Sequence, residues 1–112
     1  MPFPTRQQIM TLAKYGVIPG TTSLVCRRML QYIEAFPQEH RAGRAKDMCA
    51  RQRDYLCKSV VFEGLPGTGI VRAVYAKKVR LGTWEFVADV MWHDTLRDST
   101  VELKHLVVLQ NN

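Results

Sequence analysis

The stretch that decides the fold is Trp84-Glu85-Phe86-Val87-Ala88-Asp89-Val90-Met91-Trp92. Its largest apolar residues fall on alternate positions, and this period of two is typical of a strand with one buried face. Shorter apolar or β-branched runs lie on both sides of it, at 56–62, 70–79, 100–103 and 107–109. A Gly/Pro turn at 64–69, a turn at Gly82 and a polar turn at 93–99 separate these runs. We therefore expect five short strands.

The chain before residue 55 has the spacing of helices instead. Thr5 and Gln8 form a capping-box pair ahead of apolar residues at helical intervals, and Gly16 stands where that helix would end. A second amphipathic helix is expected to follow and to end or kink at Pro37. Residues 44–54 are good helix formers with a thin apolar stripe, which predicts a third helix.

Two resemblances add to this pattern. Gly69-Ile70-Val71-Arg72, the stretch 84–92 and Val101-Glu102-Leu103-Lys104-His105-Leu106 resemble the strands of an SH3-like barrel of the KOW/Tudor kind, over residues 57–109. In such barrels a glycine opens one strand, an alternating strand follows, and a short turn precedes the last strand. Residues 5–36 are similar, more faintly, to the SAP-like helical hairpins appended to nucleic-acid proteins.

A small closed barrel also suits five short strands, because closure removes exposed sheet edges. We predict an α+β protein in which a helical part, 1–54, packs beside a five-stranded antiparallel SH3-like barrel, 55–112.

Composition excludes several classes of protein. A chain of 112 residues with 46% apolar and 23% charged residues has the balance of one ordinary folded domain or two very small modules. No apolar run approaches the roughly 18–20 residues that span a bilayer, and the first residues lack the features of a secretory signal. An odd number of cysteines fits reduced thiols in the cytoplasm better than a disulfide framework.

Motifs for catalysis or cofactor binding are weak. Gly64-Leu65-Pro66-Gly67-Thr68-Gly69 has the glycines of a phosphate loop, but Ile70 and Val71 stand where Lys and Ser/Thr are needed. The spacing of the cysteines favours no zinc site, the histidines are scattered, and no carboxylate pair stands out. We expect no metal, no cofactor and no enzymatic activity.

The charge is segregated along the chain. The net charge is +6, and residues 41–80 carry +7 while the remainder carries −1. If the third helix packs beside the hairpin, their cations merge into one basic band able to contact phosphates, with Tyr75 as an exposed stacking residue. The predicted nucleic-acid-binding residues are Arg41, Arg44, Lys46, Arg51, Arg53, Arg72, Tyr75, Lys77, Lys78 and Arg80.

This band predicts a small accessory protein that binds DNA or RNA through backbone contacts as part of a larger complex. The same charges also suit a solvated helix face and an edge strand protected by lysines. The alternative function is a protein-interaction adaptor, or an inhibitor that docks on a nucleic-acid-processing enzyme, in which case the acidic stretch 85–102 matters as much.

Overall fold

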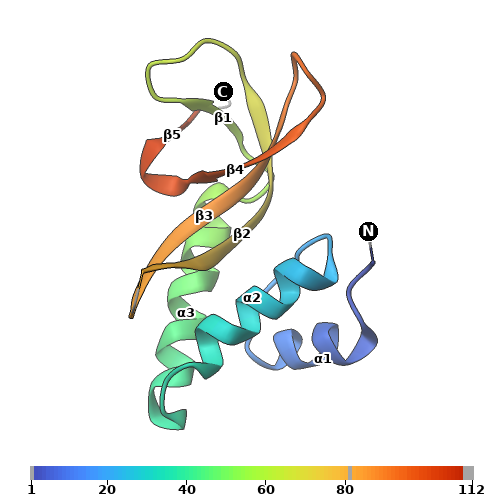
Figure 1. The fold of residues 1–112 in the computed structure, drawn as a ribbon, viewed down its shortest axis with the longest axis vertical. Helices are drawn as coiled ribbons and strands as arrows, with labels where there is room; N and C mark the ends of the chain where they lie inside the picture. The colour runs from blue at the N-terminus through green and yellow to red at the C-terminus, as the bar shows by residue number, and fades with distance from the viewer. Residues whose placement is uncertain (1, 81, 110–112) are drawn as a thin grey trace.

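The structure, a computed structural model, describes residues 2–80 and 82–109. Within these residues, three helices pack against a five-stranded antiparallel sheet (Figure 1). The helices are α1 (Arg6–Lys14), α2 (Ser23–Glu34) and α3 (Gln38–Tyr55). The strands are β1 (Ser59–Phe62), β2 (Gly69–Arg80), β3 (Thr83–Trp92), β4 (Asp98–Glu102) and β5 (Leu106–Val108), with a single 3-10 turn η1 (Leu103–His105) before β5. The predicted α+β class is confirmed.

The first helix begins and ends as its sequence predicts. The Gln8 amide N–H donates to Thr5 Oγ1 at 3.1 Å, and the Thr5 N–H donates to Gln8 Oε1 at 3.0 Å, which completes the capping box. Gly16 follows the last turn with a φ of +75°, the left-handed conformation that glycine adopts most readily. Thr22 caps α2 through its side chain alone, which accepts from the Val25 N–H.

The third helix is longer than predicted, because it starts at Gln38 rather than at residue 44. Pro37 occupies the N-cap position of α3, so it begins this helix as well as separating it from α2. Gly43 is accommodated within α3, where it is exposed and where a Cβ would contact no neighbouring atom.

The strands form an open sheet in the order β4-β3-β2-β1-β5. β1 pairs with β2 on one side, at Val60 and Gly69, and with β5 on the other, at Val61 and Val107. Among the described residues no pairing joins β4 to β5, so the sheet is not closed into the barrel that we predicted. The reason is that β2 and β3 extend well beyond the other strands, and α2 and α3 cover this extension in their place.

Two apolar clusters hold the helices and the sheet together. One lies between the helices and the half of the β2–β3 hairpin that is nearer its turn, and its members include Leu12, Met29, Ile33, Met48 and Tyr75. The other lies around the shorter strands, with Val60, Val71, Val90 and Leu106. Phe86 contacts both clusters and links the helical layer to the sheet. Among the described helices, none is long and apolar enough to cross a membrane.

Candidate functional site

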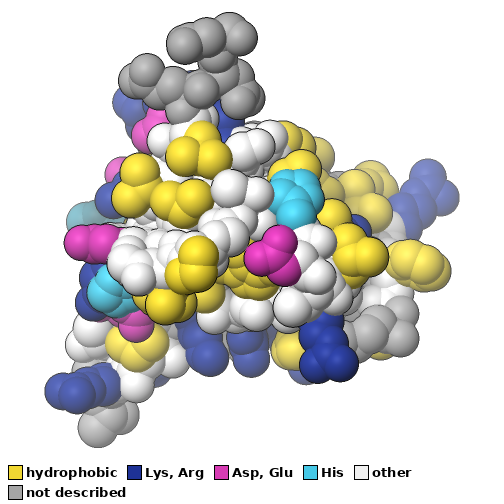
Figure 2. Space-filling model, turned by 90° about the horizontal axis from the view of Figure 1, so that it is seen from above, with side chains coloured by type: hydrophobic (Ala, Val, Ile, Leu, Met, Phe, Trp, Pro, Cys, Tyr) yellow, Lys and Arg dark blue, Asp and Glu magenta, His cyan; other side chains and the backbone are white. Residues whose placement is uncertain are grey.

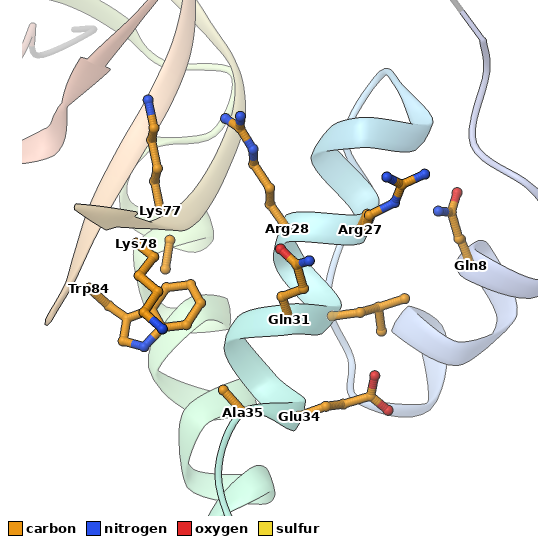
Figure 3. Close-up of a pocket in the computed structure, with 11 residues that line it drawn as sticks. Gln8, Arg27, Arg28, Gln31, Glu34, Ala35, Lys77, Lys78 and Trp84 are labelled. Atoms are coloured by element: carbon orange, nitrogen blue, oxygen red, sulfur yellow. The ribbon is translucent and has the colours of Figure 1, made fainter. Parts of the chain in front are cut away.

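A groove of about 780 Å³ opens between α2 and the half of the β2–β3 hairpin that is nearer its turn (Figure 3). Helix α2 supplies one wall and strand β2 the other, while Trp84 of β3 lines the groove beside β2. The polar and aromatic side chains that line the groove include Arg27, Arg28, Gln31, Glu34, Lys77, Lys78 and Trp84.

The groove is strongly basic. Four cations line it, two from each wall, against the carboxylate of Glu34. Arg28 is half-buried, and the other three cations are exposed. The ion pairs recorded among the described residues use Arg72, Lys104 and two histidines, all of which lie outside the groove. The four groove cations are thus available to an anionic ligand.

Aromatic rings connect α3 to the wall of this groove. The Arg51 guanidinium lies 4.2 Å from the centroid of the Phe86 ring, which places this residue of α3 against β3. Tyr32 packs edge-on against both Trp84 and Phe86, with ring centroids 5.4 Å apart in each pair. The Arg44 guanidinium lies 3.4 Å from the centroid of Phe36, and its Nη1 donates to the Tyr32 hydroxyl at 3.4 Å.

The predicted basic band is therefore united only in part. Arg44 and Arg51 of α3 reach the aromatic rings beside the groove, and Lys77 and Lys78 line the groove itself. Lys46 lies with Arg44 at a smaller hollow at the α2–α3 corner, outside the groove.

Other members of the band lie elsewhere. Arg53 lies near Cys49, on the side of α3 that faces the end of α1. Burial raises the pKa of the Cys49 thiol, and the positive charge of Arg53 opposes this effect. Arg41 is half-buried and its Nε donates to the Phe36 carbonyl at 3.3 Å. Arg80 is exposed at the end of β2 next to the hairpin turn.

The prediction that Tyr75 is an exposed stacking residue is wrong. Its side chain is 1% exposed and belongs to the cluster between the helices and the sheet. The hydroxyl donates to Asp89 Oδ1 at 3.0 Å, and Thr100 Oγ1 donates to the same oxygen at 2.9 Å. Burial, and then the nearby Asp89 carboxylate, raise the pKa of Tyr75. The charged residues that flank Tyr75 in sequence gave no sign that helices cover this face of the sheet.

Arg72 is also separated from the groove. It lies near the start of β2, six residues and about 20 Å along the strand from Lys78. Its Nη1 is 3.6 Å from Oδ2 of Asp98, the first residue of β4, which lies on the other side of β3. The acidic end of the chain contains a second close pair, since Lys104 Nζ lies 3.0 Å from Glu102 Oε2 and this contact raises the pKa of Lys104.

Sequence reasoning missed Arg27 and Arg28. The signal was present as two adjacent arginines in an otherwise apolar helical pattern, but the glutamates that follow at 34 and 39 reduced the apparent charge of that segment.

Figure 2 shows the loop end of the sheet, which is the end away from the groove. Few Lys or Arg side chains face the viewer there, and several line the lower border of the view. Within residues 2–80 and 82–109, no group of three or more His, Cys, Asp or Glu side chains is placed to hold a metal ion.

Comparisons of the chain with protein-family models, with curated proteins and with solved structures find no match. The function of the groove therefore rests on the chemistry of its own side chains.

Proposed function

We propose that this protein binds nucleic acid without catalysing a reaction, and that the groove between α2 and the β2–β3 hairpin is its principal contact surface. The observation that carries the proposal is the convergence of four cations on one groove from two elements far apart in sequence. Arg27 and Arg28 come from α2, and Lys77 and Lys78 come from β2. With Glu34 included, the charged lining of the groove is +3.

The physical basis is the release of counterions from a polyanion. Each phosphate that a lysine or arginine neutralises frees condensed counterions, and this gain does not depend on base sequence. Arg44 and Arg51 lie outside the groove lining, over the rings of Phe36 and Phe86, and extend the positive charge onto α3. Because a guanidinium stacked on a ring keeps its N–H groups in its own plane, these two arginines can still donate to phosphate oxygens.

A KOW/Tudor-like relationship remains part of the proposal. Gly69 is the first residue of β2, the alternating stretch corresponds to β3, and a 3-10 turn comes before the last strand, all as the resemblance implies. The sheet is open, however, so the likeness concerns the strands and their order along the chain rather than closure. A chain of this size suits an accessory subunit that holds DNA or RNA within a larger complex.

The alternative, a protein-interaction adaptor, has less support from the acidic stretch 85–102. Three of its carboxylates already have partners within the chain: Asp89 accepts from two hydroxyls, Asp98 pairs with Arg72, and Glu102 pairs with Lys104. The groove cations have no such recorded partners among the described residues, which favours an external anion.

The proposal is tested by titrating labelled single-stranded DNA, duplex DNA and RNA with the wild type and two double variants at low salt. Arg28→Ala/Lys77→Ala removes one arginine and one lysine from opposite walls of the groove. Lys58→Ala/Arg97→Ala removes the same two residue types from exposed positions at the other end of the β2–β3 hairpin.

We expect micromolar binding by the wild type, at least about a tenfold loss in the groove variant, and about the wild-type affinity in the matched control. No binding of any nucleic acid at about 50 mM salt overturns the proposal, as does an equal loss in both variants.

A further inference from the structure

The groove contains more than charge, because its two ends differ in character. In Figure 3 the side chains of Arg28 and Lys77 extend toward the same end, one from each wall. Trp84 and Glu34 line the other end. A phosphate chain is attracted to the first end, whereas at the second end the carboxylate of Glu34 offsets the charge of Lys78, which lies beside Trp84.

The floor of the groove is apolar. Leu30 of α2, Ala76 of β2 and the half-buried ring of Trp84 contribute to it, and Ala35 adds an exposed methyl group directly after α2. Such a surface gains nothing from phosphate, but it suits the flat face of a nucleobase.

Trp84 is held in place as a rigid platform. It lies directly opposite Lys78 in the β2–β3 register, and it packs with Tyr32 in a T-shaped pair whose ring centroids are 5.4 Å apart at an interplanar angle of 72°. A ring fixed in this way loses little side-chain entropy when a base stacks on it, so stacking contributes most of its energy to binding.

We infer that the groove takes single-stranded nucleic acid, with phosphates between Arg28 and Lys77 and a base stacked on Trp84. This inference rests on the proposed function and specifies its ligand. A duplex keeps its bases paired and stacked, so it presents only phosphates to the cations of the groove, and no base contacts the apolar floor or Trp84. An unpaired strand offers both chemical groups to the two ends of one groove.

Tryptophan fluorescence tests the inference directly, because the chain has two tryptophans on the same strand. Trp92→Phe leaves Trp84 as the sole tryptophan, and Trp84→Phe leaves Trp92, which packs in the other apolar cluster. The probes are oligodeoxythymidine, a DNA duplex of mixed sequence, and inorganic polyphosphate as a polyanion without bases.

We expect oligodeoxythymidine to quench the fluorescence of Trp92→Phe with a saturable curve, while the emission of Trp84→Phe changes little. Polyphosphate and the duplex should leave the Trp84 emission nearly unchanged. In a separate binding assay, Trp84→Leu should weaken binding of the single strand by about five- to a hundredfold and binding of the duplex by less than about twofold. Thermal unfolding of Trp84→Leu checks that the fold is retained.

The possible failures are distinguishable. Binding of single strand and duplex with equal affinity, or single-strand binding without quenching of Trp84, overturns this inference but leaves a groove that binds phosphates. The absence of binding to every probe by the wild type overturns both this inference and the proposed function.

Discussion

The side-chain amide of Gln52 joins α3 to the sheet: its Nε2 donates to the carbonyl oxygen of Val74 on β2 at 3.2 Å. The same amide group donates to the Ile18 carbonyl at 2.8 Å, and its Oε1 accepts from the Ile18 N–H at 2.9 Å. Gln52 is 3% exposed, the one buried polar side chain recorded among the described residues. It therefore helps to fix the helix that carries Arg44 and Arg51 against the rest of the fold.

Gln52→Leu should lower the free energy of unfolding by about 2 kcal/mol, because the buried Val74 carbonyl and two part-buried main-chain groups of Ile18 lose their partner. Gln7→Leu, at an exposed position on α1, should change it by less than about 0.5 kcal/mol. Urea denaturation measures both. Equal stabilities for the two variants would contradict the structural role of Gln52.

Tyr75→Phe should reduce stability by about 1 kcal/mol, because it removes the buried hydrogen bond to Asp89. Nucleic-acid affinity should stay at the wild-type level, since the ring does not reach the surface. Urea denaturation and the DNA titration check the two parts. A loss of affinity without a loss of stability would restore Tyr75 as a contact residue.

Alkaline pH should act through the same residue. Because the pKa of Tyr75 is raised in the folded state, its protonated hydroxyl contributes stability that is fully present below its unfolded pKa, near 10. That stability is lost as the pH rises through the folded pKa. The difference in stability between the wild type and Tyr75→Phe should therefore shrink above about pH 10, and a difference that grows there would be inconsistent with a buried neutral phenol.

The three free cysteines should react with iodoacetamide in an order set by burial. Cys57 is exposed and should react first, Cys49 is half-buried, and Cys26 is fully buried. Burial also raises the pKa of Cys26 and so lowers the fraction of reactive thiolate. Mass spectrometry over a time course gives the order, and modification of Cys26 as fast as Cys57 in the native protein would show that the helical cluster is packed differently.

Local sequence signals were sufficient for most elements of this fold. The capping box of Thr5 and Gln8 is completed within four residues, and the alternation over 84–92 reflects the pleat of a single strand. The start of α3 was predicted too late because Gly43 disfavours a helix interior and because Pro37 is compatible with two positions, the end of one helix or the beginning of the next. Choosing between them depends on how α2 and α3 pack.

The site was less predictable, because side chains from distant segments create it. A sum of charge along the sequence identified Lys77 and Lys78, but it gave no means of pairing them with Arg28, which reaches the same groove only through packing of α2 on β2. The same packing buries Tyr75, although the charged residues Arg72 and Lys77 lie close to it on either side in the sequence. Closure of the sheet likewise depended on whether strands or helices cover the ends of β2 and β3.

The salt dependence of single-stranded DNA binding tests most directly whether the groove is the contact surface. The slope of log Kobs against log salt counts the phosphates that the protein neutralises, at about 0.7 per contact on a single strand. Arg28→Ala/Lys77→Ala should reduce the magnitude of this slope by about 1.4, and Lys58→Ala/Arg97→Ala should leave it unchanged. An equal reduction in both variants, or no reduction in the groove variant, would contradict binding through the groove.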